Sequence, residues 1–238
     1  MSGLNFKAMA RFNKGKTRYY KSLDEAAEAA ARVIHYNSGI GSWKFEYCMG
    51  IHGNATNYDD GNSYFLTELH GGTNGTRAVL PSYDVGLKEV GYSLKAMVHS
   101  HPTDTTNTTP PLANELSVAD FCEALNIEGR FGGAIVFYLI TQNWAFTRFT
   151  PPLNSNALSS AHLQINSAAR HNFRRVNNRS FINSKDDIIL ARERLPFAGN
   201  YAIYATLIND IVNNGGEHKQ KNLNNNSSWK PIYLSGSN

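Results

Sequence analysis

The spacing of hydrophobic and polar residues changes several times along the chain, and the order of these patterns predicts an α/β fold. The first element is a helix. Residues 24–36 are rich in alanine, and Ser22 stands three positions before Glu25, which is the spacing of a capping box. The Asn-Ser-Gly sequence at 37–39 is expected to end this helix.

Apolar runs between turns rich in glycine, asparagine and proline predict strands at 43–51, 64–70, 95–101, 132–141 and 144–149, with a weaker pattern at 78–80. The run at 95–101 is apolar until its last residues, which is typical of a buried strand with polar side chains at its end. Apolar residues at helical spacing, including Val118 and Phe121, predict a helix over 117–127. The intervening residues 102–116 are rich in Thr, Asn and Pro and predict a loop.

The composition changes near residue 150, after which asparagine becomes frequent. Helical patterns are expected at 158–176, 184–194 and 200–213, followed by a polar tail. The predicted organisation has three parts: a basic N-terminal arm at 1–21, a mixed α/β domain at 22–150, and a basic, asparagine-rich helical extension with a polar tail at 151–238.

Composition narrows the function. The 238 residues are 41% hydrophobic, which is enough for a buried core, and no stretch approaches the roughly 20 apolar residues that a membrane-crossing helix needs. The first residues lack the apolar segment of a signal peptide, so we expect a cytoplasmic protein or one secreted by a signal-peptide-independent route. Two cysteines, Cys48 and Cys122, are too few for a disulfide framework or a cysteine-rich zinc site.

The net charge of +4 is the sum of three segments with different charges. Residues 1–21 hold six basic and no acidic residues, 22–150 hold seven basic and fourteen acidic, and 151–238 hold ten basic and five acidic. An acidic central segment argues against a phosphate-rich substrate in its cleft, and no aromatic-interleaved recognition motif is visible, so nucleic acid is disfavoured as a partner.

Candidate chemistry lies in the sequence Val-His-Ser-His-Pro at 98–102. Residues two apart in a strand point to the same face, so His99 and His101 can offer two nitrogens to one Zn²⁺. Asp120, in the first turn of the next helix, can supply a third ligand, with Ser117 beside it. Each element also has a purely structural interpretation: Ser117 and Asp120 have the spacing of a capping box, and a His-x-His pair can serve surface polarity or core hydrogen bonding.

The combination of His-Ser-His-Pro, then Ser-x-x-Asp, with a glutamate on an earlier strand, resembles the motif of the JAMM (JAB/MPN) zinc metalloproteases. In detail it is most similar to the divergent JAB-like domains of bacterial polymorphic toxins and secreted effectors. The resemblance covers about 23–150 and implies a mixed, deaminase-like sheet flanked by helices. It implies that His99, His101 and Asp120 are the zinc ligands. It also implies that Ser117 forms a hydrogen bond to the oxyanion of the tetrahedral intermediate.

The resemblance also calls for a glutamate as general base, and two are available. Glu46 follows the first helix, where the family places its base, and Glu68 lies on the next strand; chain order favours Glu46. Two departures put ubiquitin-type specificity in doubt: the loop 102–116 is longer than the usual spacing, and the base strand reads Glu-x-x-x-Gly. Cys48 shares a strand face with Glu46, but a small buried cysteine is the simpler interpretation.

The function implied is a zinc-dependent metallopeptidase that hydrolyses a peptide or isopeptide bond with a zinc-bound water, as a bacterial effector or toxin domain. The partners implied are a protein or peptide substrate and a cognate inhibitor or immunity protein. Two alternatives stay open: a catalytically idle JAB-like scaffold that binds a partner through its basic helices, and a hydrolase acting on a non-protein amide or on nucleic acid. The zinc-deaminase pattern of H-x-E with P-C-x-x-C is absent from the sequence.

Overall fold

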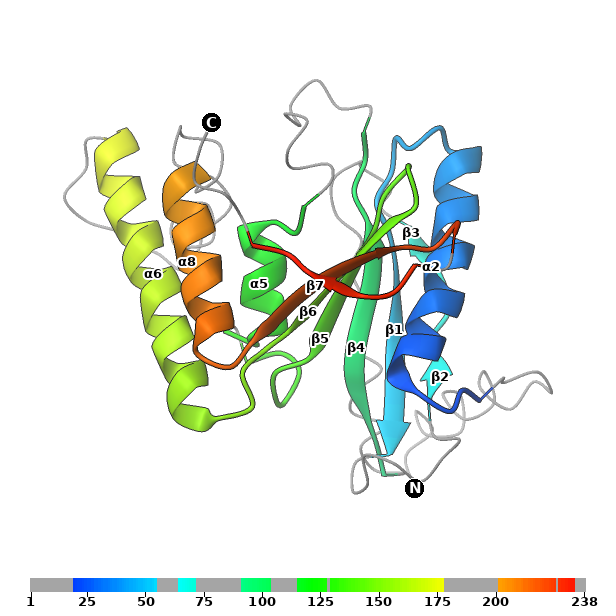
Figure 1. The fold of residues 1–238 in the computed structure, drawn as a ribbon, viewed down its shortest axis with the longest axis horizontal. Helices are drawn as coiled ribbons and strands as arrows, with labels where there is room; N and C mark the ends of the chain where they lie inside the picture. The colour runs from blue at the N-terminus through cyan, green and yellow to red at the C-terminus, as the bar shows by residue number, and fades with distance from the viewer. Residues whose placement is uncertain are drawn as a thin grey trace, which may run out of the picture. The chain divides into compact units, whose positions relative to one another are not determined.

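The computed structural model describes residues 19–54, 64–71, 91–103, 115–127, 129–177, 201–225 and 227–233. The fold is mixed α/β, with helices flanking one open sheet of eight strands in the order β2-β1-β4-β5-β6-β7-β8, and with β3 also paired to β1 (Figure 1). In chain order the elements are α2 (Leu23–Ile40), β1 (Tyr47–Asn54), β2 (Phe65–Leu66), β3 (His70–Gly71), β4 (Tyr92–Ser100), α5 (Val118–Ala124), β5 (Val136–Ile140), β6 (Ala145–Thr150), α6 (Ser155–Asn177), α8 (Tyr201–Asn213), β7 (Glu217–Asn222) and β8 (Lys230–Pro231).

Helix α2 begins where its capping residues predict. The Ser22 hydroxyl accepts a hydrogen bond from the Glu25 N–H at 3.1 Å, and the alanine-rich face of the helix is fully buried. The predicted end at 37–39 is wrong, because the helix continues to Ile40 and is capped by Gly41.

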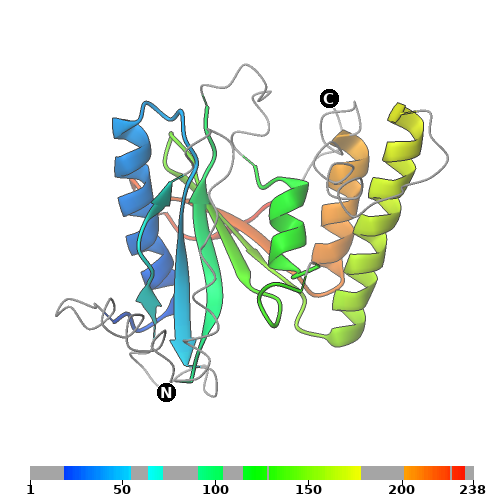
Figure 2. The ribbon, with the colours of Figure 1, turned by 180° about the vertical axis from the view of Figure 1, so that it is seen from behind.

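Strand β1 pairs antiparallel with β4, with Cys48 opposite His99 and Met49 opposite Val98. Its other edge pairs with β2 and β3, so β1 lies between them and β4 (Figure 2). The strand predicted at 43–51 begins four residues later, because Trp43 has a φ of 56°, which is incompatible with an extended strand.

The second predicted strand, 64–70, is divided into the short strands β2 and β3. Thr67 lies between them and bonds to β1 through both its N–H and its hydroxyl. The weak pattern at 78–80 and the predicted helix at 184–194 lie outside the described residues, as does most of the N-terminal arm.

By its contacts the chain divides into two compact units. The first comprises 1–113, 138–146 and 222–226. Its core is the alanine face of α2 packed on β1 and β4. The Tyr138 hydroxyl donates to the Asp24 carboxylate at 2.6 Å, and the Tyr138 ring stacks on Phe146 at 5.3 Å.

The second unit comprises 114–137, 147–221 and 227–238. Helix α6 packs against α8, and Phe121 of α5 meets Phe149 of β6 edge to face at 4.6 Å. The helices predicted near 158–176 and 200–213 are confirmed as α6 and α8.

The polar segment predicted after α8 contains a strand, β7, that the sequence patterns did not predict. One face of β7 is buried through His218, while the neighbouring lysines on the other face are half-buried. Among the described residues, no helix combines the length and the apolar character that crossing a membrane requires.

Candidate metal centre

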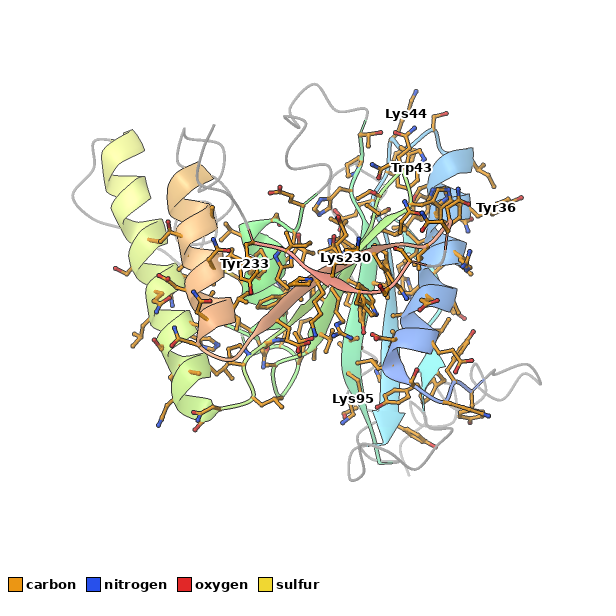
Figure 3. The ribbon with its side chains drawn as sticks, in the orientation of Figure 1. Tyr36, Trp43, Lys44, Lys95, Lys230 and Tyr233 are labelled. Atoms are coloured by element: carbon orange, nitrogen blue, oxygen red, sulfur yellow. The ribbon has the colours of Figure 1, made fainter. Side chains whose placement is uncertain are left out.

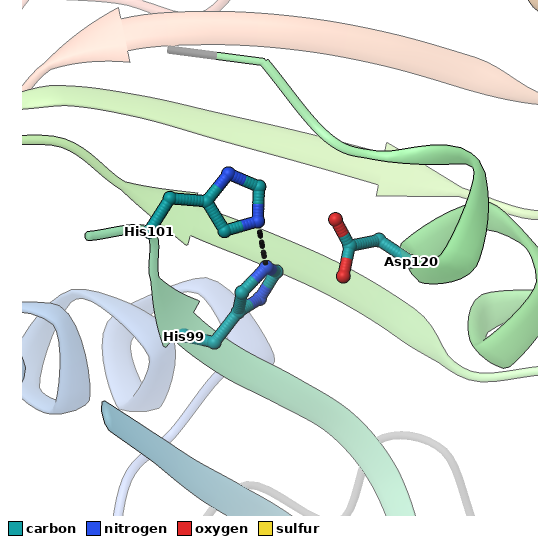
Figure 4. Close-up of side chains that lie close together, drawn as sticks. All are labelled: His99, His101 and Asp120. Carbon is teal, nitrogen blue, oxygen red and sulfur yellow. Dashed lines mark hydrogen bonds between the residues drawn. The ribbon is translucent and has the colours of Figure 1, made fainter. Parts of the chain in front are cut away.

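The end of β4 carries two histidines on one face. The His99 side chain is fully buried and His101 is half-buried. Their Nε2 atoms lie 3.1 Å apart and their ring centroids 4.9 Å apart (Figure 4). Two imidazole nitrogens bound to one tetrahedral zinc would lie about 3.3 Å apart, given zinc–nitrogen bonds of about 2.0–2.1 Å. The contact is a hydrogen bond between the two rings, as the structural interpretation of the His-x-His pair expects, and its length is also close to the spacing of two ligands on one ion.

Helix α5 begins with a reciprocal capping box. The Ser117 hydroxyl accepts from the Asp120 N–H at 3.2 Å, and the Asp120 Oδ2 accepts from the Ser117 N–H at 2.6 Å. The structural interpretation of the Ser-x-x-Asp motif is thus correct. It does not exclude the chemical one: Oδ1 of Asp120 takes no part in the box, and the Ser117 hydroxyl hydrogen can still donate a hydrogen bond.

His99, His101 and Asp120 form a group that can hold a metal ion: one ligand atom from each residue lies within 4.8 Å of the others. Two imidazoles and one carboxylate are a donor set of catalytic zinc sites, in which three protein ligands leave a fourth position open. These donor types fit such an ion, and the three residues of the group are the three that the sequence predicts as candidate ligands.

The two candidate glutamates lie in different environments. Glu46 is half-buried and directly precedes β1, two residues before Cys48, which pairs with His99 of β4. Glu68 is exposed, between β2 and β3. Its charge acts on His70, where it opposes the lowering of the histidine pKa by burial.

The Cys48 thiol has a raised pKa. Burial raises the pKa of the Cys48 thiol to about 12, and the Glu46 carboxylate adds to this rise. Directly opposed residues of antiparallel strands share a face, so Cys48 lies on the face of His99. With so high a pKa the thiol stays protonated at neutral pH, which suits the structural interpretation of this cysteine.

Sequence reasoning missed two buried polar residues close to the motif. Ser38 of α2 and Ser100 of β4 are both fully buried, and their hydroxyl oxygens lie 3.0 Å apart. The only sequence signal is that Ser100 interrupts a buried run between the two histidines.

Comparison with known proteins gives no independent assignment, since no family model matches the chain and no curated protein matches it in sequence.

Proposed function

We propose that this protein is a zinc-dependent hydrolase of the JAMM type that cleaves a peptide or isopeptide bond, with the fold of the JAB/MPN-like domains. The observation that carries the proposal is the group of His99, His101 and Asp120, in which two imidazoles and a carboxylate converge in the family's order along the chain. A role as a bacterial effector or toxin domain is the class that the sequence resemblance supports.

The chemistry divides among few groups. Zinc, when bound, polarises a carbonyl and lowers the pKa of water toward about 7. Glu46 accepts the proton of the attacking water and returns it to the leaving amine. The Ser117 hydroxyl, held by the Asp120 N–H, donates to the carbonyl oxygen as negative charge develops there.

Glu46 is assigned as the base rather than Glu68 for two reasons. Glu46 is half-buried, and it lies two residues before Cys48, which pairs with His99. Glu68 is exposed and its charge acts on His70 instead.

Zinc titration of the purified protein tests the metal part. We expect about one zinc per chain, and His99→Ala should abolish binding because two ligands do not retain zinc against a chelator. His52→Ala is the matched control, since His52 is also buried on a strand of the same sheet but lies outside the group. A folded wild-type protein that refuses zinc would overturn the proposal.

Hydrolysis tests the base. In a peptide pool read by mass spectrometry, Glu46→Gln should lower the cleavage rate about 100-fold or more with zinc retained, whereas Glu68→Gln should cleave like the wild type. Equal loss in both variants, or loss only in Glu68→Gln, would contradict the assignment of Glu46.

A further inference from the structure

The hydroxyl pair of Ser38 and Ser100 lies on the face of β4 opposite the two histidine side chains. Side chains alternate across a strand, so Ser100 points to the face of β4 opposite that of His99 and His101, toward α2. Both hydroxyls are fully buried, and their 3.0 Å bond links residues 62 positions apart. A buried hydroxyl without a partner costs free energy, so this bond holds β4 to α2 at one register.

The Ser100 hydroxyl also extends the pairing of β1 with β4. The strand register ends at Cys48 and His99, and one residue further the Tyr47 N–H donates to the Ser100 hydroxyl at 3.2 Å instead of to a backbone carbonyl. The residue before Tyr47 is Glu46. One side chain, inserted between the two histidines in sequence, thereby also holds the start of the strand that carries the proposed base.

The backbone turn between α2 and β1 reinforces this arrangement. The Trp43 N–H donates to the Ser38 carbonyl at 2.7 Å, and the Trp43 carbonyl accepts from the N–H of Thr103, two residues beyond His101, at 2.9 Å. Trp43 is 4% exposed and has a φ of 56°, a conformation that costs a bulky residue energy and is held here by burial and by the two bonds. Figure 3 shows Trp43 at the end of α2 that connects to β1.

We infer that the Ser38–Ser100 hydroxyl pair is a positioning device that holds His99 and His101 at metal-binding spacing and fixes the start of β1, directly after Glu46. The inference rests on the proposed function. The hydroxyls contact neither substrate nor metal. They act through the backbone of β4 and β1, as the outer partners of metal ligands do, and removing such partners typically weakens metal affinity about 10–100-fold.

A matched control comes from the other edge of β1. The buried Thr67 hydroxyl accepts the Gly50 N–H at 2.8 Å, so it makes the same kind of side-chain bond to the same strand. Gly50 lies four residues from Glu46, and no bond of Thr67 involves β4. Loss of either hydroxyl should lower thermal stability, but only the loss at Ser100 should disturb the metal centre.

The experiment measures Zn²⁺ affinity by chelator competition and the visible absorption of the Co²⁺-loaded protein. Ser100→Ala should weaken zinc binding about 10–100-fold and change the Co²⁺ spectrum, and Ser38→Ala should act in the same direction more weakly. Thr67→Val should match the wild type within about twofold despite a comparable fall in Tm. Ser100→Thr, which restores the hydroxyl, should recover the wild-type spectrum.

Three results would overturn this inference and leave the proposed function intact. They are wild-type zinc affinity in Ser100→Ala, an equal loss of zinc affinity in Thr67→Val, and no recovery of the Co²⁺ spectrum in Ser100→Thr. If Ser100→Ala does not fold, Ser38→Ala decides, because it leaves the Tyr47 bond in place, and wild-type affinity in that variant counts against the inference. A folded wild-type protein that binds neither Zn²⁺ nor Co²⁺ instead overturns the proposed function, and this inference with it.

Discussion

Helices α2 and α5 begin with the same local motif and use it differently. Each starts with a serine that caps the helix, followed three residues later by an acid. On α2 the motif is exposed, and the Glu25 carboxylate accepts from the Lys21 N–H at 3.1 Å. On α5 it is partly buried, and Asp120 accepts from the N–H of its own capping residue, Ser117, at 2.6 Å.

The difference shows that the acid of a capping box can also belong to a group that could hold a metal ion. The Asp120 carboxylate is held to the helix end by one oxygen and also belongs to the group with His99 and His101. Glu25 is one methylene longer, reaches the backbone before the cap, and takes part in no such group among the described residues. Among the described residues, the same local signal thus belongs to a candidate metal site on α5 and to none on α2.

The largest expected difference between the two helices is in zinc affinity after the acid of each motif is removed. Asp120→Ala should weaken zinc affinity by more than about 100-fold because a ligand is lost, while Glu25→Ala should bind zinc like the wild type. Competition with a chromogenic chelator measures both variants. Equal zinc affinity in the two would show that the α5 motif is only a cap.

Removing the serine of each motif should give similar stability but different activity. Ser117→Ala and Ser22→Ala should each lose about 1 kcal/mol of unfolding free energy, since each removes a helix cap. Only Ser117→Ala should also lower the rate of peptide hydrolysis, by about 100-fold, because it removes a donor to the developing oxyanion. Urea unfolding and cleavage of the same peptide pool provide the two readouts, and full hydrolysis by Ser117→Ala would remove its catalytic role.

The histidines that pack near the two helices should differ in their response to pH. His218 meets Phe121 of α5 edge to face at 5.9 Å, and burial lowers its pKa from 6.5 to about 4. His35 of α2 is less buried: its ring stacks on Trp144 at 3.5 Å, and burial lowers its pKa while a bond to the Gln142 carbonyl opposes the change.

For His218 the folded pKa lies below the unfolded value, so the unfolded chain takes up the proton first as the pH falls. Its contribution to stability is present above pH 6.5 and is lost toward pH 4, by about 2 kcal/mol at pH 5. Urea unfolding at pH 7 and pH 5 should show this loss, and His218→Phe should reduce it by a similar amount. His35→Phe is the control. If the free energy of unfolding of His218→Phe depends on pH as it does in the wild type, the prediction is contradicted.

The smallest expected effect is on the free energy of unfolding and concerns Asp24 of α2, which bonds to another element. The Tyr138 hydroxyl donates to the carboxylate of Asp24, next to Glu25, at 2.6 Å. Tyr138→Phe should lower the free energy of unfolding by about 1 kcal/mol without changing zinc affinity, because the bond only ties the helix start to β5. Thermal denaturation with and without zinc measures this, and a change in zinc affinity would link α2 to the metal centre.

Much of the fold could be predicted locally, and the errors have local causes. Caps and periodicity placed the starts of α2 and α5 and the strand that ends at the histidines. The strand before Glu46 was predicted too early because apolar residues such as Trp43 fit a strand pattern, whereas its positive φ is stabilised by bonds to Ser38 and Thr103. Strand β7 was missed because its sequence is polar and only its pairing partners make it a strand.

The sequence by itself determined which side chains share an element: the two-residue period of a strand puts His99 and His101 on one face, and a serine with an acid three residues on starts a helix. Tertiary structure decided which of these elements meet. Within the first unit it paired Cys48 of β1 with His99 of β4, and Ser38 with Ser100 across 62 residues. Local propensities act over a few residues, whereas such pairings depend on how the whole core packs.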